Sequence, residues 1–122
     1  MPELAYVDNI EDLTLKNTYY RNVLFTTKNM QLVLMSLLPG EEIGKEVHND
    51  ITQFFRIEQG EGEVIFGEND LIRKITTNDA IVIPSGTLHN IKNIGKYELK
   101  LYTIYTPANH PDRLMQKTKP VS

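Results

Sequence analysis

An all-β sandwich or barrel is the fold class that this sequence predicts, on three observations. Short runs rich in β-branched and aromatic residues recur along the chain. Gly, Pro, Asn and Asp separate these runs at short intervals. Helical patterns are confined to two short segments, Ile10–Lys16 and 112–117, each long enough for a turn or two only. Such a combination is typical of antiparallel strands joined by tight turns.

The strands are predicted from local composition and from the turn residues that bound them. Pro39 ends the second strand, and Gly60 separates the third from the fourth. Residues 67–70 read as a hairpin turn, 84–86 (Pro-Ser-Gly) end the sixth strand, and Gly95 lies between the last two. These residue types favour turns and interrupt strands. The predicted strands are 19–27, 30–38, 52–59, 61–66, 71–76, 80–83, 88–93 and 97–106.

The strand 30–38 differs from the others because both of its alternating faces are apolar. Only Gln31 and Ser36 are polar within it. A strand of this kind is covered on two sides. The core of the barrel covers one side, and either a second subunit or the N-terminal segment of the same chain covers the other. Both explanations fit the pattern, and we expect the protein to be a homodimer.

Length and composition describe one ordinary domain. The chain has 122 residues, so we expect a single domain with its core over about 18–106 and a C-terminal tail over 107–122. A net charge of −3 gives no support for nucleic-acid binding. The absence of cysteine excludes disulfides and thiolate chemistry. No signal peptide and no apolar run of membrane-spanning length are seen, so we expect a cytoplasmic protein that does not enter a membrane.

Four polar side chains fall where the strand pattern predicts inward-facing positions. Glu46 and His48 are two residues apart and share one face of an extended segment. Gln53 begins the next strand, and His89 follows the Pro-Ser-Gly turn. Ligands from three neighbouring segments can converge on one point. A mixed nitrogen and oxygen set suits Mn, Fe, Co, Ni or Zn as a divalent ion.

The spacing of these residues resembles the two motifs of the cupin superfamily. The first motif, G-x5-H-x-H-x4-E-x6-G, aligns in order with Gly40, Glu46, His48, Gln53 and Gly60. The second, G-x5-P-x-G-x2-H-x3-N, aligns in order with the set Asn78, Pro84, Gly86, His89 and Asn93. The resemblance covers about half of the chain and matches every interval. It implies a single-domain cupin β-barrel, a jelly roll of two antiparallel sheets, with a divalent metal held by the four polar residues.

Two of the four implied ligands depart from the family pattern. Glu46 replaces the first histidine of the motif, and Gln53 replaces its glutamate. The carboxylate has moved to position 46, so the total ligand charge of −1 is retained. Two imidazoles and an amide oxygen form a weaker transition-metal site than three imidazoles and a carboxylate. Asn78, in place of the motif glycine, tolerates a left-handed backbone.

Three functions follow from the resemblance. The first is a metalloenzyme of isomerase-like type, close to the sugar-phosphate-isomerase-like cupins, with the metal as a Lewis acid on a carbonyl or hydroxyl oxygen and Glu46 moving a proton. The second is a metal-dependent dioxygenase. The third is a non-catalytic domain that binds a small ligand. In each case the expected partner is a small molecule.

Four further residues receive predictions from position alone. His110, between Asn109 and Pro111, is interpreted as a surface histidine. Arg56 alternates outward from Gln53, which favours an ion-pair role. One of Tyr102 and Tyr105 is expected to line the barrel.

Overall fold

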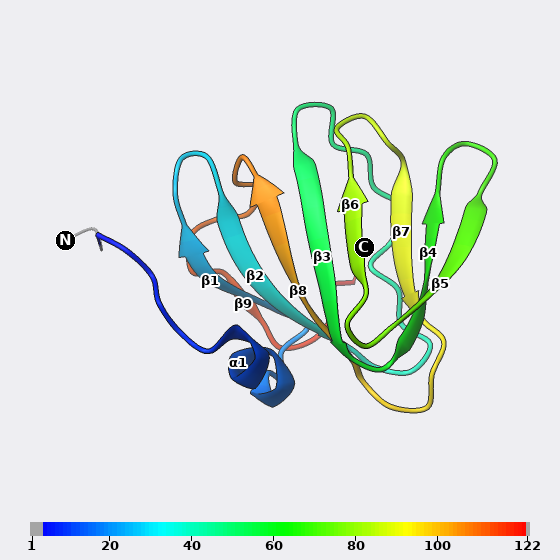
Figure 1. Ribbon diagram of the computed structural model, residues 1–122, viewed down its shortest axis with the longest axis horizontal. Coiled ribbons are helices and arrows are strands. Elements are labelled where there is room, and N and C mark those ends of the chain that lie inside the picture. The colour runs from blue at the N-terminus through cyan, green and yellow to red at the C-terminus, as the bar shows by residue number, and fades with distance from the viewer. Residues whose placement is uncertain (1–3, 122) are drawn as a thin grey trace.

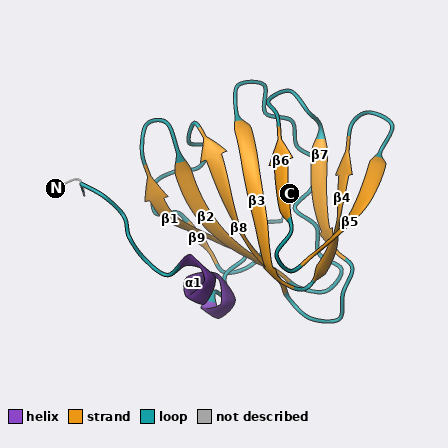
Figure 2. Ribbon diagram, in the orientation of Figure 1, coloured by secondary structure: helices purple, strands orange, loops and turns teal. Residues whose placement is uncertain are grey.

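The computed structural model describes residues 4–121 and confirms the all-β prediction. Two antiparallel sheets face each other, and one short helix lies below them in the view (Figures 1 and 2). The helix is α1 (Ile10–Lys16). The strands are β1 (Arg21–Thr26), β2 (Gln31–Leu37), β3 (Thr52–Gln59), β4 (Glu61–Phe66), β5 (Leu71–Thr76), β6 (Ala80–Ile83), β7 (His89–Asn93), β8 (Leu99–Thr106) and β9 (Met115–Gln116).

The two sheets have different widths. The larger sheet has the order β6-β3-β8-β2-β1-β9, and the smaller has the order β5-β4-β7. The segment 41–48 extends the smaller sheet beyond β7 through isolated bridges, Glu42 to Lys92 and Glu46 to His89. From β3 onwards the chain passes back and forth between the two sheets, as in a jelly roll, with β4, β5 and β7 in the smaller sheet and β6 and β8 in the larger. The turns behave as predicted: Asp70 N donates to the Gly67 carbonyl across the β4–β5 hairpin, and Asn78 has a φ of 75°.

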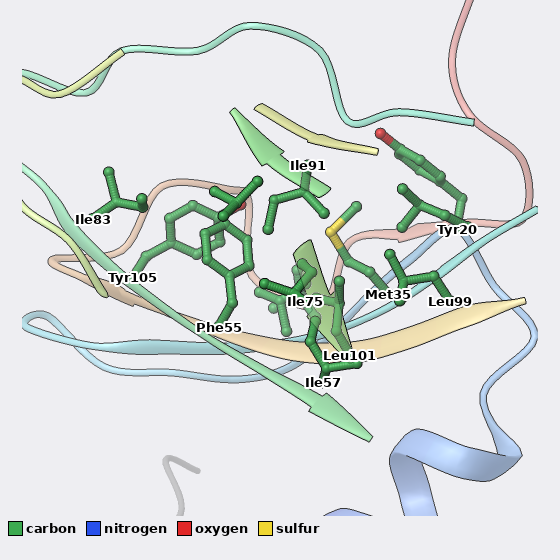
Figure 3. Close-up of a cluster of buried hydrophobic side chains, with 14 residues drawn as sticks. Tyr20, Met35, Phe55, Ile57, Ile75, Ile83, Ile91, Leu99, Leu101 and Tyr105 are labelled. Atoms are coloured by element: carbon green, nitrogen blue, oxygen red, sulfur yellow. The ribbon is translucent and has the colours of Figure 1, made fainter. Parts of the chain in front are cut away.

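The core lies between the sheets and is built by strand alternation. Every second residue of β8 is buried, from Leu99 through Leu101 and Thr103 to Tyr105. Figure 3 shows the aromatic members Phe55 and Tyr105 side by side in this core. Tyr105 therefore lines the barrel, as expected for one of the two tyrosines. Tyr102 lies on the other face of β8, with its ring near that of Phe54.

The outer face of β2 is covered by the N-terminal segment of the same chain. Leu34 and Ser36, on that face, are 2% and 6% exposed. Helix α1 packs against β2, β3 and β8, and begins at Asn9, whose side chain accepts from the Asp12 N–H. This packing accounts for the doubly apolar pattern without a second subunit. No helix among residues 4–121 has the length and hydropathy that a membrane span requires.

The tail differs from its prediction as a helical turn. Met115 and Gln116 form β9, which pairs with Asn22 and Arg21 at the edge of the larger sheet. The Val23 N–H donates to the Leu114 carbonyl, which continues the pairing. An edge strand exposes unpaired N–H and C=O groups, and β9 satisfies those of β1. The prediction of a helical turn at 112–117 was wrong because pairing with β1, which is distant in sequence, determines the conformation of this segment.

Alanine at Gly60 should destabilise the fold much more than alanine at Gly67. Both glycines have positive φ, 103° and 80°, which costs an alanine about 1–2 kcal/mol. A Cβ at Gly60 would also lie 2.9 Å from the Glu98 carbonyl oxygen, whereas a Cβ at Gly67 meets nothing within 4 Å. We expect a loss of about 1 kcal/mol for Gly67→Ala and about 3 kcal/mol for Gly60→Ala in urea unfolding. Equal losses for both variants would contradict this packing.

Candidate functional site

The four predicted site residues come from neighbouring segments at one end of the barrel. Glu46 and His48 lie on the segment that extends the smaller sheet, Gln53 is the second residue of β3, and His89 is the first residue of β7. The backbones of Glu46 and His89 exchange two hydrogen bonds, both of 2.9 Å. The Gly86 N–H donates to the His48 carbonyl at 2.7 Å. The structure thus brings all four residues together, as two pairs of side chains.

The first pair is Glu46 with His48. The Glu46 Oε2 and the His48 Nε2 are 3.1 Å apart, with the two side chains 28% and 15% exposed. The approach lacks hydrogen-bond geometry, so the buried Nε2 has no hydrogen-bond partner among the described residues. A buried imidazole nitrogen without a partner, next to a carboxylate, is suited to a cation.

The second pair, Gln53 with His89, is oriented by a chain of hydrogen bonds. The Thr103 hydroxyl donates to the Phe54 carbonyl at 2.8 Å and accepts from the Gln53 Nε2 at 2.9 Å. The amide oxygen of Gln53 must then face His89, and it lies 3.2 Å from the His89 Nε2. The His89 Nδ1 lies 3.0 Å from the Thr87 carbonyl oxygen, so both ring nitrogens of His89 face an oxygen that can only accept. A neutral ring donates to only one of these two oxygens, so a lone pair of Nε2 faces the Gln53 Oε1 whenever the proton is on Nδ1.

These four groups fit a divalent cation in their donor chemistry. The site offers one carboxylate, two imidazole nitrogens and one amide oxygen, and the rings of His48 and His89 are 5.7 Å apart between centroids. Across residues 4–121, no three His, Cys, Asp or Glu side chains are grouped closely enough to hold a metal. Glu46, His48 and His89 are therefore not drawn together into such a grouping in this structure.

A second set of polar groups lies beside this site and was missed by sequence reasoning. The Gln31 side chain is fully buried and holds the tail: its Oε1 accepts from the backbone N–H of Asn109 and of His110, and its Nε2 donates to the His110 carbonyl. The His110 ring is thereby placed with its Nε2 3.2 Å from the Tyr105 hydroxyl. The Asn109 Nδ2 also approaches Nε2, so Nε2 is an acceptor and the Tyr105 hydroxyl donates to it.

His110 is therefore not the surface histidine that its position beside Pro111 suggested. The prediction was wrong because Gln31, 79 residues away in sequence, fixes the His110 backbone and so holds the ring, half-buried, against Tyr105. No local signal reveals such a contact. Arg56, in contrast, forms the expected ion pair, with its Nε 3.4 Å from the Glu58 Oε1.

Arg21 is a basic residue on the inward face of the larger sheet. Arg21 and the core residue Val23 are two positions apart on β1, so their side chains lie on the same face of the strand. One terminal nitrogen of Arg21 donates to the Gln116 side chain on β9, and the guanidinium lies 5.1 Å from the Tyr20 ring centroid. The Arg21 Nε is buried and has no hydrogen-bond partner among the described residues. Its parity with Val23 was the sequence signal that could have identified it.

Burial and opposite charges keep the neighbouring groups neutral. Burial raises the pKa of Tyr105 well above its usual range, and the Glu46 carboxylate raises it further, while Arg21 opposes this shift. Burial lowers the pKa of His110 from 6.5 to about 4, and the charges of Arg21 and His48 add to the effect. At neutral pH the Tyr105 hydroxyl therefore keeps its proton and the His110 ring is uncharged. Glu46 and Arg21 are the groups of opposite charge that act on the Tyr105 hydroxyl.

A hollow of about 490 Å³ lies away from this site, at the other end of β3. Gly60, Thr76 and Lys96 are among its lining residues. It contains none of the four predicted ligands and no histidine. The polar end of the barrel therefore remains the candidate site.

Known proteins resemble this chain in sequence and in structure. The family model described as Cupin domain matches residues 33–105. Protein L612 of Acanthamoeba polyphaga mimivirus is 47% identical over 97% of this chain and 75% of its own length. Protein YrkC of Bacillus subtilis (strain 168) is 45% identical over 93% of this chain, and the chain spans 63% of YrkC. The crystal structure of BH2720 from Bacillus halodurans superposes with a TM-score of 0.91 at 42% identity, covering 93% of this chain and 89% of that one.

The stability of the fold should fall on acidification in a way that depends on His110. Above pH 6.5 the ring is neutral in both the folded and the unfolded chain. Between pH 6.5 and about 4 the unfolded chain takes up a proton that the folded ring does not, so stability is lost as the pH falls. We expect about 1 kcal/mol from this half-exposed group after solvent screening.

Urea unfolding at pH 7 and pH 4.5 measures the effect, with His110→Gln as the comparison. The variant should lose less stability than the wild type between the two pH values, because glutamine does not titrate. Identical losses would show that His110 does not hold a depressed pKa.

Proposed function

The chain belongs to the cupin family, and from that membership we propose that it binds a divalent transition metal ion and acts on a small organic molecule. The ligands would be Glu46, His48, Gln53 and His89. Their single negative charge leaves a net charge of +1 once a divalent ion is bound. The enzyme would be of isomerase-like type.

The observation that carries this proposal is the fixed orientation of Gln53 towards His89. The hydrogen-bond chain through Thr103 leaves the Gln53 Oε1 facing the His89 Nε2 at 3.2 Å, while the His89 Nδ1 faces a second acceptor, the Thr87 carbonyl. Two acceptors at this distance repel unless a cation or a proton lies between them. The Nε2 of His48, which has the Glu46 carboxylate beside it but no hydrogen-bond partner among the described residues, is a third donor atom at the same end of the barrel.

The surrounding residues support proton transfer in a partly dry site. A bound divalent ion would supply a Lewis acid that polarises a carbonyl or hydroxyl oxygen. Glu46 is 28% exposed and lies beside His48, which places its carboxylate where it can accept a proton from a substrate and return it. The buried side chains of Phe55 and Ile91 limit the access of water from the core side.

A second candidate function is ligand binding without turnover. It is favoured by the finding that no three His, Cys, Asp or Glu side chains group as a metal site within the described part of the chain. The amide of Gln53 is a weak ligand, and the barrel end would then hold a small molecule by hydrogen bonds alone. Metal content separates the two candidates.

The first prediction concerns metal content. Protein purified without a histidine tag should contain near-stoichiometric metal by mass spectrometry, and Glu46→Ala and His48→Ala should each lose most of it. Glu42→Ala is the matched control, since Glu42 lies on the same segment but its carboxylate accepts from Asn90. A redox-active metal would direct the next assays to oxygen consumption, as for a dioxygenase, and a redox-inert one to proton exchange, as for an isomerase.

Wild-type protein that is free of metal, and gains no thermal stability from added Mn, Fe, Co, Ni or Zn, would exclude the metalloenzyme. The ligand-binding candidate would then stand.

A further prediction tests the hydrogen-bond chain that orients Gln53. Thr103→Val keeps the shape of the buried side chain but removes the hydroxyl that fixes the amide. Loss of such an outer partner typically weakens metal affinity by about 10–100-fold, so we expect an effect of about tenfold. Thr103→Ser retains the hydroxyl and should bind metal nearly as the wild type does. Equal affinities for the valine and serine variants would show that the amide orientation is not required.

A further inference from the structure

The outer side of the larger sheet carries an apolar row that crosses five strands. Strands β6, β3, β8, β2 and β1 lie next to one another in that order (Figure 1). At one level, the register pairs an apolar residue of each strand with an apolar residue of the next. These side chains face away from the core, because the residues that flank them on β3, β8 and β2 are buried. We call this set the outer row and define it, in strand order, as Val82, Phe54, Ile104, Leu32 and Phe25.

The protein's own chain covers the outer row only in part. Helix α1 packs against β2 where Leu34 and Ser36 are buried, whereas Leu32 is the one residue of β2 that is not buried. Val82, at one end of the row, is 60% exposed, and the other members are partly exposed. Monomeric proteins rarely expose a contiguous apolar surface that extends over several strands. A surface of this kind indicates a protein partner.

The residues beside the outer row also have the character of a protein interface. The ring of Tyr102, on the same face of β8, lies 6.2 Å from that of Phe54 between centroids. Arg56 pairs with Tyr102 across β3 and β8, and its charge is matched by Glu58, whose Oε1 is 3.4 Å from the Arg56 Nε. The centres of interfaces are enriched in aromatic residues and depleted of unmatched charge. The surface therefore suits an apolar protein surface better than an ionic ligand.

The segment ahead of α1 carries apolar side chains that the barrel leaves exposed. We call residues 4–9 the arm, and Figure 1 shows it running away from the barrel. Leu4 is 105% exposed and Val7 is 91% exposed. Tyr6, between them, has its ring centroid 5.3 Å from that of Phe25, so the arm passes the end of the outer row. One chain thus holds an exposed apolar surface and, next to it, an exposed apolar segment.

We propose that the outer row binds a second copy of this chain, sheet against sheet, and that the arm of each copy lies on the sheet of the other. A two-fold axis parallel to the strands and passing Ile104 accounts for both exposed features, because β8 is the middle strand of the five. Ile104 then meets its own counterpart, and Phe54 of one copy meets Leu32 of the other. Phe25, with the arm beside it, lies over Val82. An interface of this symmetry is closed, so it forms dimers and no longer assemblies.

The size of the surface agrees with a stable dimer. Strands about 4.8 Å apart, and three levels of side chains about 6.8 Å apart, give a face of about 24 by 20 Å, or about 500 Å². The arm, if extended, adds a strip about 20 Å long and about 10 Å wide, or about 200 Å². The total of about 700 Å² in each copy is close to the value of about 800 Å² per partner that is typical of specific interfaces.

Sedimentation velocity of the full chain over a range of concentrations measures the association. We expect a species of twice the chain mass of 14.0 kDa. Val82→Glu places a charge against the arm of the other copy and should raise the dissociation constant of the dimer about tenfold or more. Ile72→Glu is the matched control, since Ile72 is 57% exposed but lies on β5 of the smaller sheet. It should leave the dissociation constant within about twofold of the wild type.

Two further experiments locate the contact. Replacing Leu4 and Val7 together by serine should weaken the dimer about tenfold, whereas Val121→Ser, at a fully exposed side chain of the tail, should not. The chain has no cysteine, so Ile104→Cys introduces a single thiol that faces its own counterpart across the axis. A bis-maleimide that spans about 10 Å, the spacing of facing sheets, should join two such chains. The same reagent should not join two chains that carry Ile72→Cys.

The dimer can fail these tests in distinguishable ways. A mass of 14.0 kDa at every concentration would overturn the inference, and so would a dimer that Val82→Glu and Ile72→Glu weaken equally. Crosslinking through Ile72→Cys but not through Ile104→Cys would place the interface on the smaller sheet and overturn it as well. A dimer that depends on Val82 but tolerates both serine substitutions in the arm would overturn the exchange of arms. Metal content is measured separately, so the proposed function and the dimer stand or fall independently.

Discussion

The register of β8 between its two neighbours determines where chemistry can occur in this barrel. Tyr105 pairs with Gln53 on one side and with Gln31 on the other, so the three polar side chains form one inward-facing row. The row two residues deeper contains Phe55, Thr103 and Val33, and the next one contains Ile57, Leu101 and Met35. A slip of one residue would turn the entire row outward and bring the opposite faces of the strands into the core. The polar end and the packed core are consequences of the same alignment.

The three members of this row have different partners, and together they organise the barrel end. Gln53 is turned towards His89 by Thr103, and Gln31 fixes the backbone of Asn109 and His110. Tyr105 lies between them and donates to His110. The tail is thus part of the barrel end, although the sequence marks it only by prolines and scattered charges. Its strand β9 also holds Arg21 through Gln116.

Short-range patterns carried enough information for the strands, the turns and the inward parity of Glu46, His48, Gln53 and His89. These features depend on neighbours in sequence or on a period of two. His110, Arg21 and β9 depend on contacts between residues about 80 to 95 positions apart, such as Gln31 with His110 and Arg21 with Gln116. Such contacts leave no local pattern. For the same reason, the sequence left undecided whether a second subunit or the N-terminal segment packs on the outer face of β2. An apolar face shows that something packs on it but not which segment does.

The exchange of residue types at positions 46 and 53 is consistent with the burial of each position. Gln53 is 3% exposed, and the Thr103 hydroxyl beside it already donates to a carbonyl. A carboxylate there would be desolvated and could not accept from Thr103, whereas an amide donates to it. Glu46 is 28% exposed, so its charge remains hydrated. The chain therefore keeps one carboxylate at the barrel end at a lower cost to the metal-free fold. The same choice leaves Gln53 a weaker metal ligand than a carboxylate would be, so retention of a metal depends more strongly on Glu46 and the two histidines.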